Sequence, residues 1–150
     1  MNFLLRTDSY KFTHWKQYPA NTTGIYSFLE ARGGMFPNTV FFGLQYYLKA
    51  YFEGPRFTPG DIRQADEFCR EHFGGALFNR EGWTRLYQKH HGILPIRIRA
   101  VPEGTVVPLK NALLTIENTG RRIPLAHQLS RNIAAESLVS PQPSQRYREK

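Results

Sequence analysis

The sequence predicts an α/β (α+β) domain in which a mixed sheet is flanked by helices. Three observations support this: an alternating apolar pattern near the N-terminus, a central block with helical periodicity, and a return of alternation after residue 93. A chain of 150 residues normally forms one domain around one core. The order of a strand, then helices, then strands fits layers of helix and sheet.

The first predicted elements are a short helix and a strand. Asp8 and Ser9 are helix-capping residue types, and they predict a helix that runs to Gln17 and is stopped by Pro19. Residues 24–32, GIYSFLEAR, alternate and contain branched and aromatic side chains, which predicts a strand.

The central block predicts three helices. Residues 39–52 place apolar side chains three and four positions apart, so this helix would bury one broad face. Thr58 followed by Pro59 is a typical helix start, and it predicts a helix to about Phe73. The stretch EGWTRLYQKHH predicts a further helix that stops at Gly92.

Strands return after the helices. Residues 94–100 alternate so that Ile96 and Ile98 share one face and two arginines lie on the other. Residues 105–108 and 113–117 predict two more strands separated by turns.

Composition favours a folded cytoplasmic protein without a membrane partner. Hydrophobic residues make up 41% and aromatic residues 14% of the chain, more than disordered proteins carry. The single cysteine, Cys69, excludes an internal disulfide and favours a reducing compartment. No apolar run approaches the ~18 residues of a membrane span, and the one at the N-terminus is too short for a signal peptide.

The net charge of +8 raises the question of an acidic partner. Half of that charge lies in residues 121–150, which hold six basic and two acidic side chains. No predicted helix carries basic residues along one face, and RNA-binding and zinc-finger spacings are missing, so we predict no nucleic-acid partner. The composition of the last thirty residues predicts a disordered tail.

The sequence contains no strong catalytic motif. Adjacent His90 and His91 cannot share a helix face, so no metal site is predicted there. Cys69 on a helix is expected to be a packed thiol rather than a nucleophile. His14 and His72 show no partner in the sequence, and we interpret them as solvated or structurally bonded.

Three residues are candidate ligand contacts. Asp8 and Tyr10, near a predicted helix start, can offer a carboxylate and an aromatic face to a flat polar ligand. The competing interpretations are helix capping by Asp8 and core packing of Tyr10. Arg32 directly follows a predicted strand, and its guanidinium suits the geometry of a phosphate, although a solvated arginine is the alternative.

Several unusual words in the sequence resemble one family. They are TDSYK at residues 7–11, FFGLQYYL at 41–48 and AVPEGTVVP at 100–108. In this order, within residues 3–119, they resemble the N-terminal region of the nicotinamide phosphoribosyltransferases. The resemblance implies a pentosyltransferase that joins nicotinamide to phosphoribosyl pyrophosphate, giving nicotinamide mononucleotide and pyrophosphate for NAD biosynthesis. It also implies Mg²⁺ with phosphoribosyl pyrophosphate and ATP as an activating co-substrate, none of them bound by this chain.

The resemblance also implies roles for the three candidates. The family enzyme is a homodimer whose active sites lie between a barrel-like domain of one subunit and residues of the other. By resemblance, Tyr10 crosses that interface and stacks on nicotinamide, Asp8 lies beside it, and Arg32 reaches a ligand phosphate. We find no counterpart of the family's catalytic histidine or amide-reading aspartate, so the chain alone is predicted to be inactive. A fragment of a nicotinate-using phosphoribosyltransferase and a non-catalytic binding or dimerisation module remain alternatives.

The sequence leaves the family pattern after residue 119, where a motif close to WLTNYLETLLL would follow. When residues 125–140 are translated back into DNA with chosen synonymous codons and one base is removed, the new reading frame encodes WLTNYLETLLLSLWYP. A second change of frame near Pro141 gives IPTTVATLSRE. We therefore expect a family domain at 1–119 and an out-of-frame, disordered tail at 120–150. We also expect exposed apolar surface, notably on residues 39–52, with poor solubility or loose packing.

Overall fold

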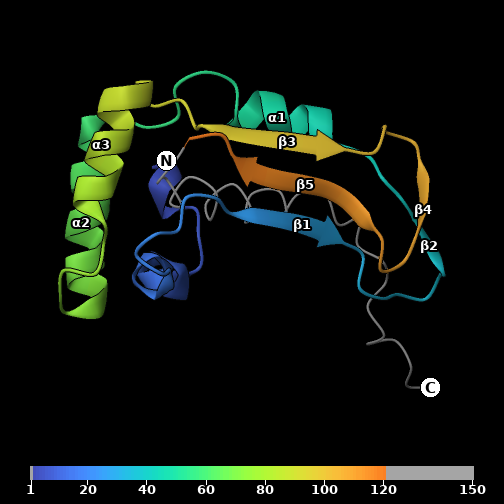
Figure 1. Cartoon of the computed structure of the whole chain (residues 1–150), viewed down its shortest axis with the longest axis horizontal. Helices are drawn as coiled ribbons and strands as arrows, with labels where there is room; N and C mark the ends of the chain where they lie inside the picture. The colour runs from blue at the N-terminus through green and yellow to red at the C-terminus, as the bar shows by residue number, and fades with distance from the viewer. Residues whose placement is uncertain (1, 121–150) are drawn as a thin grey trace.

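The computed structural model describes residues 2–120, so the predicted tail from residue 121 onward lies outside the described part. Helices and strands combine as the predicted class requires, with a pair of helices at one end and a sheet at the other (Figure 1). None of the helices in the described part is long and apolar enough to cross a membrane. The elements are the 3₁₀ helices η1 (Phe3–Leu5) and η2 (Ser9–Gln17), strand β1 (Tyr26–Glu30), strand β2 (Asn38–Val40), helices α1 (Leu44–Tyr51), α2 (Pro59–Phe73) and α3 (Arg80–His90), and strands β3 (Ile96–Ala100), β4 (Val106–Pro108) and β5 (Ala112–Asn118).

Every described strand pairing is antiparallel, whereas the sequence analysis expected a mixed sheet. β5 lies between β1 and β3 and is antiparallel to both, and β2 and β4 form a separate antiparallel pair. Two neighbouring parallel strands must be joined by a crossover connection of a dozen or more residues, which usually contains a helix. The connection from β3 to β5 is shorter and contains only β4 and turns, which favours the antiparallel arrangement.

The two faces of the three-stranded sheet differ in character. One face packs against α1 through a buried cluster that includes Phe41, Leu44, Leu114 and Ile116. No helix or strand between residues 2 and 120 covers the other face, which we call the open face. Its cross-strand rows join Tyr26, Glu117 and Arg97, then Phe28, Thr115 and Arg99. The predicted alternation in β3 is confirmed, because Ile98 belongs to the packed cluster and both arginines are exposed.

The prediction of one helix over residues 39–52 is wrong in its first part. Strand β2 ends at Val40, and α1 begins only at Leu44. Gly43 has a φ of 97°, a left-handed conformation that glycine adopts without strain, and it separates the strand from the helix. Val40 is opposite Val106 in the β2–β4 pair, where branched side chains are favoured.

The remaining helices form a second cluster, which we call the helical lobe: η1, η2, α2 and α3. α2 begins as predicted, with Pro59 in the first turn and a capping box between Thr58 and Asp61. The core of the helical lobe contains Phe57 and Trp83, whose ring centroids lie 5.2 Å apart in an edge-to-face arrangement. We call the five strands and α1 the sheet lobe.

Cys69 lies in the core of the helical lobe and is fully buried. Burial raises the pKa of its thiol to about 11. The predicted packed thiol is therefore confirmed, because a nucleophilic cysteine needs a lowered pKa and access to solvent.

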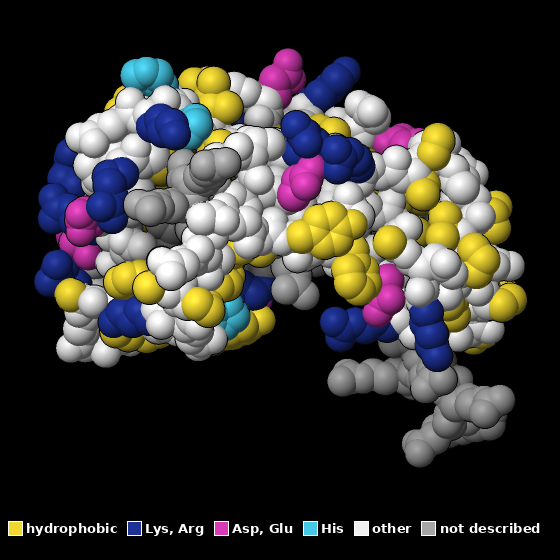
Figure 2. Space-filling model, viewed as in Figure 1, with side chains coloured by type: hydrophobic (Ala, Val, Ile, Leu, Met, Phe, Trp, Pro, Cys, Tyr) yellow, Lys and Arg dark blue, Asp and Glu magenta, His cyan; other side chains and the backbone are white. Residues whose placement is uncertain are grey.

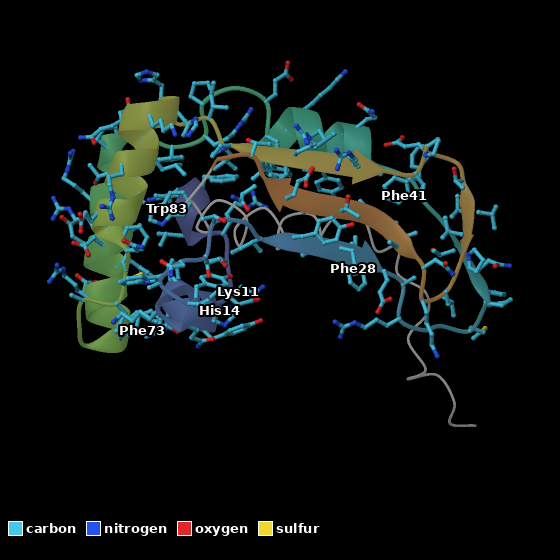
Figure 3. All side chains as sticks on the ribbon, viewed as in Figure 1. Lys11, His14, Phe28, Phe41, Phe73 and Trp83 are labelled. Atoms are coloured by element: carbon cyan, nitrogen blue, oxygen red, sulfur yellow. The ribbon has the colours of Figure 1, made fainter. Side chains whose placement is uncertain are left out.

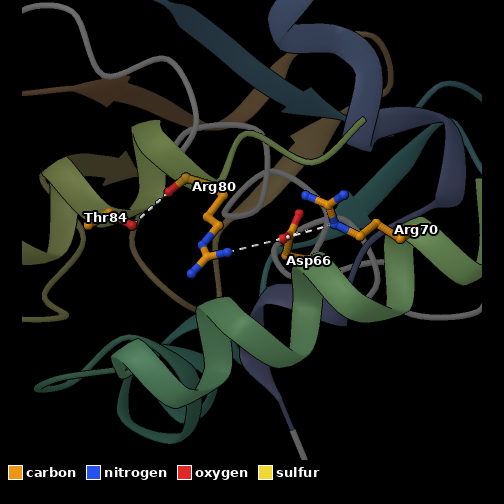
Figure 4. A network of polar contacts seen from close by, with 4 residues as sticks. All are labelled: Asp66, Arg70, Arg80 and Thr84. Atoms are coloured by element: carbon orange, nitrogen blue, oxygen red, sulfur yellow. Dashed lines mark hydrogen bonds and ion pairs between the residues drawn. The ribbon is translucent and has the colours of Figure 1, made fainter. Parts of the chain in front are cut away.

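A buried carboxylate links α2 to α3 (Figure 4). Asp66 is 4% exposed, accepts a hydrogen bond of 3.2 Å from Arg70 Nε, and lies 3.6 Å from Arg80 Nη1. Thr84 Oγ1 donates to the carbonyl oxygen of Arg80 at 2.8 Å. Because an unpaired buried carboxylate is costly, the two arginines make this burial tolerable and fix the start of α3 against α2.

Candidate functional site

The three predicted ligand contacts lie in two places. Asp8 and Tyr10 are at the start of η2 in the helical lobe, and Arg32 follows β1 in the sheet lobe. Within residues 2–120, no hydrogen bond, ion pair or ring contact joins Arg32 to the other two. Figure 2 shows the outline of the molecule indented between the two lobes, below the open face of the sheet.

Asp8 occupies the N-cap position of η2, as predicted, but its side chain makes no cap hydrogen bond and pairs with Lys11 instead. Lys11 Nζ lies 2.7 Å from Asp8 Oδ2. The hydrogen bond and charge of Lys11 hold the pKa of Asp8 below its usual value. Asp8 therefore presents an ionised carboxylate at the protein surface at neutral pH.

Tyr10 exposes its ring, so the core-packing interpretation is wrong. The side chain is 58% exposed. Its ring centroid lies 5.4 Å from Lys11 Nζ and 5.2 Å from the His14 ring, tilted by 55°. Lys11 and His14 are both labelled on η2 in Figure 3. An aromatic ring that is supported by neighbours and still exposed is a surface on which a flat heteroaromatic ligand can stack.

A contact that the sequence did not reveal links η2 to α2. Ser9 Oγ and His72 Nε2 are 2.7 Å apart, and the His72 ring stacks on Phe68 at 5.5 Å. The interpretation of His72 as structurally bonded is thereby confirmed. Ser9 and His72 are 63 positions apart, so no local pattern could have paired them. This bond fixes the backbone next to Tyr10 relative to the helical lobe.

Arg32 is exposed just beyond β1. Its side chain makes no hydrogen bond or ion pair within the described part of the chain, so the guanidinium donors remain available to a ligand. The preceding residue, Ala31, accepts a backbone hydrogen bond of 2.9 Å from Lys110. This approach of Lys110 to Ala31 joins distant segments, so no local sequence pattern reveals it.

The described residues do not fit a resident metal ion. Between residues 2 and 120, no group of three or more His, Cys, Asp and Glu side chains could hold one. Asp8 and Asp66 are each paired with a cation, whereas Mg²⁺ takes oxygen ligands in octahedral geometry. His90, considered in the sequence analysis, has a pKa lowered by burial and by its neighbours Lys89 and His91. The residues between 2 and 120 therefore form no metal site of their own.

Comparison with known proteins decides the family. The family described as "Nicotinamide phosphoribosyltransferase, N-terminal domain" matches residues 2–98. The chain belongs to this family. The nicotinamide phosphoribosyltransferase of Xanthomonas campestris pv. campestris (strain 8004) is 49% identical over 118 residues, which cover 79% of this chain and 25% of the relative. Those of Acinetobacter baylyi and Mycoplasma pneumoniae are 29% and 26% identical, over 79% and 83% of this chain and 26% and 31% of the relatives.

A solved structure supports the fold. The crystal structure of human nicotinic acid phosphoribosyltransferase matches 85% of this chain and 23% of its own with a TM-score of 0.51. At 18% identity, this likeness concerns the fold alone. The chain thus spans about a quarter to a third of the length of the curated nicotinamide phosphoribosyltransferases that it matches.

Proposed function

We propose that this chain is the ligand-contacting N-terminal part of an enzyme that makes nicotinamide mononucleotide from nicotinamide and phosphoribosyl pyrophosphate. In this proposal Tyr10 stacks on the pyridine ring, Asp8 lies beside it, and Arg32 binds a phosphate. The observation that carries the proposal is the exposed, supported ring of Tyr10 within the TDSYK word of a recognised family domain. Stacking on an aromatic face buries a flat ring at low entropic cost.

Calorimetric titration of the purified chain with nicotinamide mononucleotide tests this proposal. Tyr10→Ala is expected to weaken binding at least fivefold. Tyr46→Ala is the matched control, since Tyr46 is 67% exposed on α1 and has no role in the proposal. Absence of heat with the wild-type chain, or equal affinity of the wild type and Tyr10→Ala, would reject ligand binding by this chain.

The phosphate role of Arg32 has a separate test. Arg32→Gln removes the guanidinium and is expected to weaken binding of the mononucleotide while leaving that of nicotinamide unchanged. Arg63→Gln, an exposed arginine of α2, is the control. An equal loss of affinity for nicotinamide mononucleotide and for nicotinamide would contradict a phosphate contact and indicate a general effect on folding.

We further propose that the isolated chain is not a catalyst and that the site is completed by a second subunit in a cytoplasmic homodimer. The sequence offers no counterpart of the family's catalytic histidine, and within residues 2–120 no group of three or more His, Cys, Asp and Glu side chains could hold the metal ion that accompanies phosphoribosyl pyrophosphate. Mg²⁺, ATP and phosphoribosyl pyrophosphate would then act in the complete enzyme, which we do not expect to bind nucleic acid. An assay for nicotinamide mononucleotide formation with the purified chain should show no turnover, and measurable turnover would refute this point.

Nicotinate is the alternative substrate. The fold neighbour is a nicotinic acid phosphoribosyltransferase, but its likeness extends to the fold only. Titration of the chain with nicotinate beside nicotinamide separates the two cases. We expect nicotinamide to bind more tightly, because the curated relatives that the chain matches are nicotinamide phosphoribosyltransferases.

We also propose that the gene is shifted by one base between Thr119 and Leu125 and again near Pro141. The support is that the shifted reading frame encodes the motif WLTNYLETLLL, which follows at this position in the family. Sequencing the DNA from the codon of Glu117 onward tests this directly. Two single-base differences would support the proposal, and an unchanged reading would remove it.

A further inference from the structure

We propose that Lys110 is a second phosphate-contacting residue, which acts with Arg32 to bind a phosphate or diphosphate group at the end of β1. This inference rests on the phosphate role proposed above for Arg32. It adds a residue from a different segment, 78 positions further along the chain by sequence number.

Backbone hydrogen bonds place the segment of Lys110 beside the segment of Arg32. The Lys110 amide donates to the carbonyl oxygen of Ala31 at 2.9 Å, and the neighbouring Leu109 amide donates to that of Pro37 at 3.0 Å. A backbone bond of this kind brings two chains to a spacing of about 5 Å, as between strands. Because Ala31 directly precedes Arg32, the side chains of Arg32 and Lys110 start from adjacent positions on two segments.

The charges at this place are not neutralised within the described part. Both cations are exposed, and neither forms an ion pair with a residue between 2 and 120. The acidic residue at the same strand end, Glu30, is half-buried and likewise forms no ion pair with them. Two adjacent cations repel each other, and a bound anion relieves that repulsion. Arginine supplies paired donors to phosphate, and lysine adds a point charge.

The backbone of Lys110 gives an independent observation. Its φ is 62°, in the left-handed region that is unfavourable for residues with a side chain. Glycine would adopt this conformation without strain, and asparagine with little. Non-glycine residues in such conformations cluster at functional sites, where the side chain is needed in spite of the strain. In this proposal, Lys110 keeps its charged side chain at a conformational cost.

Substitution of Lys110 by glycine is expected to have opposite effects on stability and on ligand binding. Lys110→Gly should raise the Tm by a few degrees, because it relieves the left-handed strain. The same substitution should weaken binding of inorganic pyrophosphate at least threefold, because it removes a charge from the site. Lys110→Arg keeps the charge and should retain the affinity. Lys49→Gln removes an exposed lysine on α1 and should change neither quantity.

The experiment follows amide chemical shifts of the full chain during titration with inorganic pyrophosphate at low ionic strength, with Arg32→Gln in the same series. The inference is supported if Arg32→Gln and Lys110→Gly both bind pyrophosphate more weakly and Lys110→Arg keeps the wild-type affinity. Loss with Arg32→Gln alone overturns the role of Lys110 and leaves that of Arg32 intact. An unchanged affinity in all variants, or no shift changes in the wild type, rejects both roles.

Discussion

The helical lobe and the sheet lobe differ in how far each covers its own apolar residues. The helical lobe surrounds its core on several sides, and Leu4, Ala65 and Leu86 are at most 1% exposed. The sheet lobe has a buried side toward α1 and an open side. Exposed large apolar residues gather in it, at the open face of the sheet, around β2 and β4, and on α1 (Figure 2): Tyr26, Phe28, Met35, Phe36, Val40, Phe42, Tyr46 and Val106.

This difference indicates what each lobe contributes. Large contiguous apolar surfaces on soluble proteins usually mark sites where further protein packs. The relatives that this chain matches are three to four times longer than the matched part. We therefore expect the helical lobe to be stable by itself and the sheet lobe to need further polypeptide over its apolar surface. The expectation of exposed apolar surface on residues 39–52 is confirmed at Val40, Phe42 and Tyr46.

The largest effect is expected from a core substitution in the helical lobe. Trp83→Ala should lower the free energy of unfolding by about 3–5 kcal/mol, because a large buried ring is lost and a cavity remains. Phe42→Ala in the sheet lobe should change it by less than about 0.5 kcal/mol, because Phe42 is 71% exposed. Denaturant unfolding followed by circular dichroism measures both. Equal effects would contradict the contrast between the lobes.

The polar link between α2 and α3 should have an intermediate effect. Asp66→Asn removes the charge that Arg70 and Arg80 share, and we expect a loss of about 2 kcal/mol. Glu81→Gln is the control, because its partner Arg85 and Glu81 itself are both exposed. An equal loss in both variants would show that the burial of Asp66 is irrelevant.

Cys69 gives the helical lobe a dependence on alkaline pH. Burial raises the pKa of its thiol from an ordinary value of 9.0 to about 11, so the folded state keeps the thiol proton to higher pH than the unfolded state does. The contribution of this thiol to the free energy of unfolding is fully present below pH 9 and is lost as the pH rises from 9 to 11. Stability curves of the wild type and Cys69→Ala should therefore converge over this range. Parallel curves would refute the linkage.

The smallest effect on stability is expected from polar substitutions on the exposed surface of the sheet lobe. Phe42→Ser combined with Val106→Thr should reduce binding of a hydrophobic dye and raise solubility, with little change in unfolding free energy. The wild-type chain should be poorly soluble or loosely packed. A soluble, sharply melting wild-type monomer that binds no dye would contradict the exposed apolar surface.

Local signals predicted the helical lobe better than the sheet lobe. The capping residue Thr58 and Pro59 define the start of α2, and alternation defines β3. The spacing of Phe41, Leu44 and Leu48 fits a helix, yet the helix begins only after Gly43, because pairing of β2 with β4 overrides the local pattern. Strand pairing of this kind joins distant segments, which a helical period does not reveal.

The candidate site was predicted in part. Tyr10, Asp8 and Arg32 were found from residue type, position and resemblance, and their ligand roles remain predictions. The Asp8–Lys11 pair is three positions apart and was visible in principle from the sequence. By contrast, the bond between Ser9 and His72 and the approach of Lys110 to Ala31 depend on tertiary structure.

The central claim is that the helical lobe covers its own apolar core and that the sheet lobe leaves apolar surface exposed. The most direct test is native-state hydrogen exchange followed by mass spectrometry. Amides of α2 and α3 should exchange only through global unfolding, whereas those of β1, β2 and β4 should exchange at least about a hundredfold faster through local opening. Addition of the remaining polypeptide of a relative should slow exchange in the sheet lobe only. Equal protection of both lobes in the isolated chain would contradict the account.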